Sequence, residues 1–250
     1  MTTFQNNAIL KTDNISKSYE GSLIIEDISI TLNKGELVSL LGVSGSGKTT
    51  LFNVISGLES PDSGSVWLND DNVTGKPGHI SYMLQKDLLL EHKKMIDNVS
   101  LPLILKGMNK KDARETALPY FGEFGLADAK DKYPCQLSGG MRQRGALLRT
   151  YLASQGVALL DEPFCALDAL TKSTIHQWYL EVMEKIDLST IFITHDIDEA
   201  IVLSDRIYIM GQKPGHIVAE IAIDVPRNDR QSFALTSDFL NIKKQVIGCL

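Results

Sequence analysis

The stretch that decides the fold of this 250-residue chain runs from Gly42 to Thr49 and reads Gly-Val-Ser-Gly-Ser-Gly-Lys-Thr. Its glycine spacing and its Lys-Thr ending are those of a phosphate-binding loop. A short apolar run at 36–41 precedes the loop and predicts a buried parallel strand. A helix should follow from Lys48 and end at a C-terminal cap on Gly57. Strand, glycine-rich turn and helix in this order are the context that a phosphate site requires.

Each residue type in this loop has a physical task. Glycines let backbone N–H groups close around phosphate oxygens, and the N-terminus of the following helix adds a favourable dipole. Lys48 brings a positive charge to the terminal phosphates, and the Thr49 hydroxyl can ligate Mg²⁺. The residues predicted here to contact a nucleotide are Gly42, Val43, Ser44, Gly45, Ser46, Gly47, Lys48, Thr49 and Thr50.

Further polar groups follow other predicted strands. The apolar run 157–161 ends in Asp161 and Glu162, and His195 follows a second apolar run. Because the C-terminal ends of parallel strands face the ligand crevice, Asp161 should lie beside a magnesium ion. Glu162 should then act as general base on the attacking water, with His195 at the γ-phosphate or at that water. Gln85 ends another strand and could reach both magnesium and water.

Strands and helices alternate after residue 157, which predicts a mostly parallel sheet covered by helices on both faces. The expected strands there are 157–161 and 190–194, and the expected helices are 170–186 and 197–203. Earlier and later strands are predicted, the first two of them antiparallel, at 8–13, 23–32, 64–69 and 79–84, with short strands within 208–223 around a turn at 213–215.

The middle of the chain has a different character. Residues from about 86 to 150 are rich in helix-forming stretches, are broken by Pro102, Pro119 and Pro134, and contain no convincing strand. This predicts a helical insertion within the sheet-based domain.

Composition limits the classes of partner and compartment. The chain has 25 Lys and Arg against 31 Asp and Glu, so a general nucleic-acid footprint is not expected. No secretory signal and no apolar run of membrane-spanning length is present, which favours a cytoplasmic protein that meets a membrane only through a partner. Cys135, Cys165 and Cys249 have no metal-ligand spacing and are expected to be reduced thiols.

The motifs together resemble the ATP-binding subunit of ATP-binding cassette (ABC) transporters over nearly the whole chain. The decisive element is Leu-Ser-Gly-Gly at 137–140, which stands between Gln85 and the Asp161-Glu162 pair, with Asp168 and His195 following in the family's order. The resemblance implies an α/β fold of the P-loop NTPase (RecA-like) class. It implies one domain, 1–250, with a mostly parallel core sheet, an N-terminal antiparallel β-subdomain and a helical subdomain at about 86–150.

The resemblance also implies a mechanism. ATP and Mg²⁺ would be bound by two copies packed head to tail, closing on ATP and reopening after hydrolysis. Ser138, Gly139 and Gly140 would clasp ATP held by the other copy, and Asp168 would couple the two sites. Tyr19 matches the aromatic residue that stacks on adenine, although an ordinary aromatic at a strand end is the alternative.

Within this family, three segments resemble the nitrate, sulfonate and taurine importer branch, which also includes importers of thiamine-precursor pyrimidines and riboflavin. These segments are 83–90, 163–168 and 213–218, whereas 91–94 depart from the Pro-Trp that the branch usually has. The implied partners are permease subunits, a second ATP-binding subunit and an extracytoplasmic substrate-binding protein, with this chain on the cytoplasmic face of the membrane. Apolar residues at 88–90 and 95–96 would either contact the permease or form the core of the insertion.

Two alternatives remain open at this point. An exporter ATPase would carry the same motifs. The two are distinguished by whether a substrate-binding protein belongs to the system, since its presence indicates an importer. A soluble ATP-dependent switch acting on protein or nucleic acid is disfavoured by the negative charge and by the lack of extensions.

Overall fold

The computed structural model describes residues 8–165 and 169–250. Three adjacent strands in the middle of its central sheet are buried along their whole length, as expected where helices or a second sheet cover both faces. Neighbouring strands are parallel except for the last one, which pairs antiparallel with β10. The order across the sheet is β11 (Ile217–Ala222), β10 (Arg206–Met210), β4 (Leu37–Gly42), β9 (Ser189–Thr194), β8 (Val157–Asp161) and β7 (Ser81–Met83).

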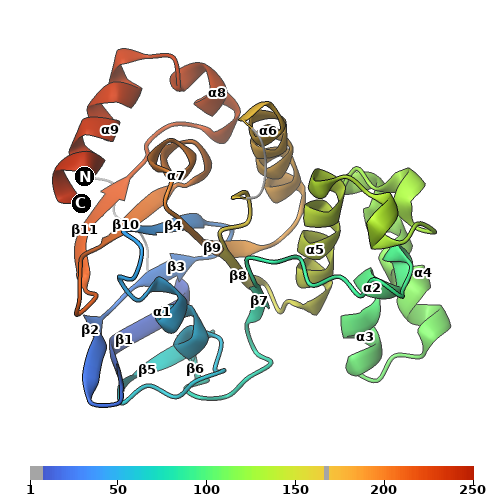
Figure 1. The fold of residues 1–250 in the computed structure, drawn as a ribbon, viewed down its shortest axis with the longest axis horizontal. Coiled ribbons are helices and arrows are strands. Elements are labelled where there is room, and N and C mark those ends of the chain that lie inside the picture. The colour runs from blue at the N-terminus through green and yellow to red at the C-terminus, as the bar shows by residue number, and fades with distance from the viewer. Residues whose placement is uncertain (1–7, 166–168) are drawn as a thin grey trace.

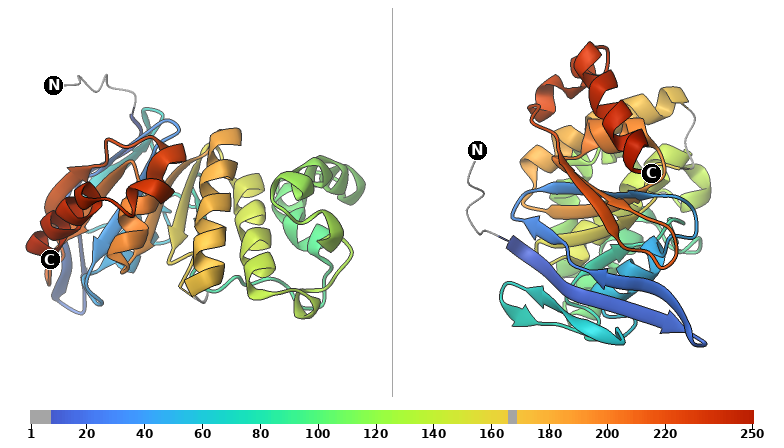
Figure 2. Two further views of the ribbon diagram at one scale, coloured as in Figure 1. Left: turned by 90° about the horizontal axis from the view of Figure 1, so that it is seen from above. Right: turned by 90° about the vertical axis from the view of Figure 1, so that its left-hand side faces the viewer.

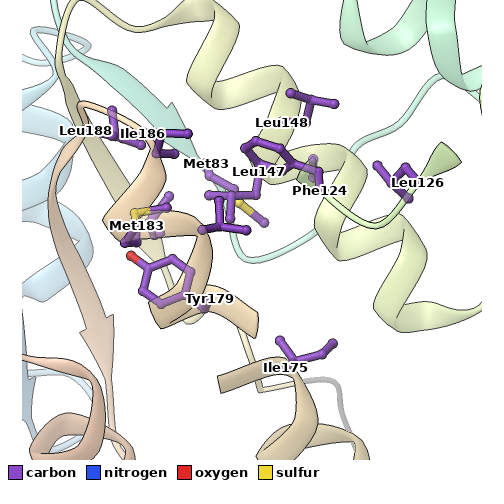
Figure 3. Packing of buried hydrophobic residues seen from close by; sticks show 14 of the residues in the cluster. Met83, Phe124, Leu126, Leu147, Leu148, Ile175, Tyr179, Met183, Ile186 and Leu188 are labelled. Atoms are coloured by element: carbon purple, nitrogen blue, oxygen red, sulfur yellow. The ribbon is translucent and has the colours of Figure 1, made fainter. Parts of the chain in front are cut away.

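Alternate residues of the central strands enter different hydrophobic clusters. On one face, Leu159 and Ile191 pack with Phe52 of α1 (Lys48–Ile55), which lies between the central sheet and the N-terminal sheet. On the other face, Leu160 and Phe192 pack with side chains from α5 (Gly139–Ala153) and α6 (Ala169–Lys185). Figure 3 shows Tyr179 and Met183 of α6 beside Met83 and Leu147 in this second cluster. Each fully buried aliphatic or aromatic side chain contributes about 1.5–3 kcal/mol.

The N-terminal sheet is antiparallel, as predicted. Its strands are β1 (Ala8–Tyr19), β2 (Ser22–Ile28), β3 (Thr31–Asn33), β5 (Ser63–Leu68) and β6 (Asp71–Asn72), in the order β2-β1-β5-β6 with β3 also on β1. The prediction of one strand over 23–32 was wrong. The segment divides because Thr12 of β1 contacts both sides of the break: its hydroxyl donates to Ile28 O, and it accepts from Ile30 N.

The middle segment is helical, and within 84–156 the structure has no strand. Its helices are α2 (Met95–Val99), α3 (Leu101–Leu105), α4 (Lys110–Glu123) and α5. Figure 2 shows α2, α3 and α4 lying away from both sheets, whereas α5 packs against the central sheet. Pro102 stands in the first turn of α3, where a missing N–H costs little. Pro119 does not break its helix, contrary to the prediction. Ala117 and Phe121 are buried on either side of it, so packing outweighs the lost hydrogen bond.

The last part of the chain covers the edge of the central sheet (Figure 1). It contains α7 (Ile197–Leu203), α8 (Arg230–Phe233) and α9 (Ser237–Cys249). Helices α8 and α9 were not predicted from the sequence. Phe239 and Val246 of α9 pack with Ile221 and Ile223. In the part of the chain that the structure describes, no helix has the length and apolar character needed to cross a bilayer.

Candidate nucleotide site

The phosphate loop owes its shape to glycine. Gly45 and Gly47 have φ angles of +79° and +97°, which L side chains rarely adopt. Gly47 is also the N-cap of α1. At Gly42, a Cβ atom would lie 2.7 Å from the carbonyl oxygen of Met210, so β10 leaves no room for a side chain. The loop can therefore present its backbone at the C-terminal edge of the central sheet.

Lys48 is folded back into this loop. Its amine donates to Gly42 O at 2.8 Å and to Val43 O at 2.9 Å, and the side chain is almost fully buried. Burial lowers the pKa of Lys48, although the charges of Glu162 and Asp161 oppose the shift. The two carbonyl oxygens thus hold the amine at the loop, where phosphate oxygens would bind.

Asp161 lies at the end of β8 and faces the first turn of α1. The Thr49 hydroxyl donates to Asp161 Oδ2 at 3.4 Å, and the Tyr82 hydroxyl donates to the same oxygen at 3.2 Å. Burial raises the pKa of Asp161, with the hydrogen bond from Tyr82 acting in the opposite direction. A hydroxyl and a carboxylate this close suit Mg²⁺, which binds one or two protein oxygens together with phosphate oxygens. Among the described residues, no larger cluster of His, Cys, Asp or Glu offers a metal site.

Glu162 is held by both of its carboxylate oxygens. Oε1 lies 3.0 Å from His195 Nδ1, and Oε2 accepts from Gln85 Nε2 at 3.0 Å. Gln85 Nε2 also lies 3.5 Å from the sulfur of Cys165. Gln85, Glu162 and His195 follow neighbouring strands β7, β8 and β9, so the predicted meeting of these three side chains at one sheet edge does occur, whereas the contact with Cys165 was not predicted.

The phosphate loop and the side chains of Gln85, Asp161, Glu162 and His195 line one cavity of about 720 Å³, whereas Tyr82 is not among its lining residues. Its wall has three parts. Tyr19 and Ile24 of the N-terminal sheet form one part, the phosphate loop and the start of α1 form the second, and residues at the ends of β8 and β9 form the third. The Tyr19 hydroxyl donates to Glu59, and the Tyr19 side chain is 39% exposed at the cavity wall. The lining residues are Tyr19, Ile24, Ser44, Gly45, Gly47, Lys48, Thr49, Thr50, Gln85, Asp161, Glu162, Ile193, His195 and Lys213.

The Ser-Gly-Gly element stands apart from this cavity. Ser138 is the N-cap of α5, and its hydroxyl accepts from Met141 N at 3.3 Å. Ser138 and Gly139 are exposed, and neither they nor Gly140 are among the cavity-lining residues. The chain thus carries a phosphate loop and a second, separate helix N-terminus that its own cavity does not use.

Comparisons with known proteins settle the family. A family model described as "ABC transporter" matches residues 25–165. The chain belongs to the ABC transporter family. The formylaminopyrimidine import ATP-binding protein of Halalkalibacterium halodurans is 41% identical over 97% of this chain and 96% of its own. The nitrate import ATP-binding protein of a Synechocystis strain is 36% identical over 84% of this chain and 79% of its own.

Solved structures agree with this assignment. A dimeric ATP-binding cassette in a post-hydrolysis state, bound to ADP and phosphate, has a TM-score of 0.72 and 29% identity, covering 87% of this chain and 100% of the other. The chain is therefore an ABC ATPase with a P-loop NTPase fold, and both the predicted family and the predicted fold class are confirmed. ATP is its nucleotide.

The structure places most predicted residues of this ABC ATPase in the cavity. Gly42, Val43 and Ser46 belong to the loop without lining the cavity, and Asp168 lies outside the described residues. Three residues were not predicted: Ile24 and Lys213, which line the cavity, and Tyr82, which contacts Asp161 without lining it. Tyr82 could have been found as a polar aromatic in a predicted strand beside Gln85, but nothing local marks the other two.

The apolar residues at the start of the helical segment were expected either to contact a permease or to form the core of the insertion, and the structure divides them between buried and exposed positions. Leu89, Met95 and Ile96 are buried in the cluster shared with α5 and α6, so these three form core. Leu88 is 53% exposed and remains free for a partner.

Proposed function

We propose that this ABC ATPase is the energy-coupling subunit of an importer, in which two copies close head to tail around ATP. The observation that carries the proposal is the convergence of Lys48, Asp161, Glu162 and His195 on one cavity beside the phosphate loop. Full-length similarity to an import ATP-binding protein supports transport as the purpose of hydrolysis. The dimeric solved cassette supports the two-copy arrangement.

Hydrolysis needs a base, a positioned water and stabilisation of phosphate charge. Glu162 is assigned as the general base, because its carboxylate lines the cavity and is anchored by His195 and Gln85. His195 and Gln85 would orient the attacking water, and Lys48 would stabilise charge on the terminal phosphates. Thr49, Asp161 and Gln85 would hold Mg²⁺, which supplies charge neutralisation at the β- and γ-phosphate oxygens when bound.

The remaining site residues would contact the adenine ring or the second copy. The half-exposed ring of Tyr19 would stack on adenine. Ser138, Gly139 and Gly140 would use the free N-terminus of α5 to bind the γ-phosphate held by the second copy. Asp168 would couple the two sites, in the segment that joins β8 to α6.

The helical subdomain at about 86–150 would receive the permease, and the whole assembly would lie on the cytoplasmic face of the membrane. An extracytoplasmic substrate-binding protein would deliver the cargo. Among the branch members considered, a small pyrimidine of the formylaminopyrimidine type is the favoured cargo, since the relative named for it is 41% identical against 36% for the nitrate importer. Nucleic acid is not expected as a partner.

The test is co-purification from detergent-solubilised membranes of a Glu162→Gln variant loaded with ATP, followed by mass spectrometry. Recovery of a polytopic permease together with a binding protein supports the importer, and the captured binding protein can then be titrated with pyrimidines and with nitrate. A permease that belongs to a system without any binding protein would favour an exporter. A chain that stays soluble with ribosomes or DNA would remove the transport claim and leave the ATP chemistry standing.

A further inference from the structure

A hairpin turn from the end of the central sheet reaches the nucleotide cavity. Its strands, β10 and β11, pair from Arg206 with Ala222 to Met210 with Ile217, and Gly211 N donates to His216 O at 2.8 Å. The turn carries Lys213, which lines the cavity. Lys48 and Lys213 are the two lysines of that lining, and Lys213 has no role in the hydrolysis described above.

The turn is fixed against both the N-terminal sheet and the phosphate loop. Gly215 N donates to Ile24 O at 2.8 Å, and Glu26 N donates to Gly215 O at 2.9 Å. A Cβ atom at position 215 would lie only 2.0 Å from the carbonyl oxygen of Ser46, so this backbone touches the loop directly. Backbone contacts two residues away therefore set the position of Lys213.

The two lysines of the cavity differ in what holds their charge. Lys48 is buried and bonded to two carbonyl oxygens of its own loop. Lys213 is exposed, and no residue in the described ranges makes a hydrogen bond or ion pair with its amine. An ammonium group facing a cavity without a carboxylate partner is a ready ligand for an anion.

The sheet order gives the side from which Lys213 approaches. β10 and β9 flank β4 on opposite sides, and β8 lies beyond β9. Lys213 therefore faces the loop from the side opposite Asp161 and Glu162. The turn is bonded to Ile24, which lines the cavity as Tyr19 does, whereas the terminal phosphate is expected beside Glu162.

We propose that Lys213 is a second nucleotide-binding cation, contacting the α/β-diphosphate that ATP and ADP share. The inference rests on the proposed function for the direction of the nucleotide, with the base at Tyr19 and the γ-phosphate at Glu162. Lys213 adds affinity for both nucleotides and takes no part in cleavage of the γ-phosphate.

The test compares Lys213→Ala with Gln212→Ala, an exposed neighbour in the same turn that does not line the cavity. Dissociation constants for ATP and ADP are measured by calorimetry on the full chain, with EDTA to prevent turnover, at low and at high salt. Lys213→Ala should weaken ATP and ADP by the same factor, about fivefold to twentyfold at low salt and less at high salt. Lys213→Arg should retain most of the affinity, and Gln212→Ala should match the wild type.

Two results would overturn the inference. Unchanged affinity in Lys213→Ala removes the contact, and a loss confined to ATP moves the contact to the γ-phosphate. Thermal melting of each variant without nucleotide separates lost binding from lost folding. Failure of the wild type to bind either nucleotide would instead contradict the proposed function, so the two failures are distinguishable.

Discussion

The carboxylate of Glu162 lies 3.0 Å from Nδ1 of His195, across the ends of the neighbouring strands β8 and β9. The backbone at Glu162 has a φ of 45°, in the left-handed region that a non-glycine residue occupies at a cost of about 1–3 kcal/mol. The contacts to His195 and Gln85 help to hold this conformation and direct the carboxylate into the cavity. A strained residue at the catalytic edge is consistent with a positioned base.

Replacement of Glu162 by Gln should separate binding from hydrolysis. The amide keeps the size of the side chain but cannot accept a proton from water, so turnover should fall by about 10²–10⁴-fold. ATP affinity should stay near that of the wild type. Lys48→Ala should instead weaken nucleotide binding itself, because it removes the cation of the phosphate loop. Phosphate release and ATP binding, measured on both variants, check this; a normal rate in Glu162→Gln would falsify the general-base assignment.

The sequence could predict most of the cavity wall because its residues follow motifs that stand at strand ends. Asp161, Glu162 and His195 each come directly after an apolar run, and parallel strands bring such positions to one edge. Lys213 could not be found in this way. It approaches the loop because Met210 pairs with Gly42 between β10 and β4, a contact between distant parts of the chain that no local pattern encodes.

Element boundaries failed where long-range contacts override local propensity. Pro119 predicts a helix end, yet α4 continues through it because buried Phe121 packs in the hydrophobic cluster that includes side chains of α5 and α6. Thr12 divides the expected strand 23–32 through hydrogen bonds made to both sides of the break. Both outcomes depend on partners that are remote in sequence, so composition and periodicity could not give them.

Removal of the Tyr82 hydroxyl should raise the magnesium requirement of the ATPase. Burial raises the pKa of Tyr82, so its hydroxyl stays protonated and donates to Asp161 at all ordinary pH values. In Tyr82→Phe, Asp161 loses this orienting bond, and loss of such a partner costs about 10–100-fold in metal affinity. The Mg²⁺ concentration for half-maximal ATPase should rise, while the rate at saturating Mg²⁺ stays close to that of the wild type. An unchanged magnesium titration would contradict the orienting role given to the bond between Tyr82 and Asp161.

Asp205 should be the main electrostatic anchor of the C-terminal segment. It accepts hydrogen bonds from Arg227, from Leu37 N at 2.9 Å, and at 2.6 Å from Arg230, a side chain that is 1% exposed. Asp205→Asn would leave the buried Arg230 charge without its partner and should lower the free energy of unfolding by about 3–5 kcal/mol. Denaturant unfolding checks this, with exposed Asp224→Asn as the control for a lost negative charge. Equal stability of the two variants would contradict it.

The same anchor should depend on pH with a defined sign. Burial alone would raise the pKa of Asp205, but the hydrogen bonds and charge of Arg227, with Leu37 N and Arg230, outweigh burial and hold the pKa below its usual value. A carboxyl group whose pKa is lowered by folding stabilises the folded state at pH values above its pKa in the unfolded chain, about 3.9. This contribution disappears as the pH falls through the pKa of the folded state. The stability difference between wild type and Asp205→Asn should therefore be constant near neutral pH and shrink below about pH 4.

Two helical glycines should respond oppositely to alanine. Gly122 in α4 is exposed, and a Cβ there would meet nothing within 4 Å, so Gly122→Ala should stabilise by about 0.5–1 kcal/mol through helix propensity. Gly145 in α5 is buried, and a Cβ would lie 2.7 Å from the sulfur of Met95, which is itself fully buried. Because Met95 must move within a packed cluster, Gly145→Ala should destabilise by about 1–3 kcal/mol. Thermal unfolding of both variants decides the matter: a stabilised Gly145→Ala would mean that Met95 relocates freely and that the α2–α5 contact is loosely packed.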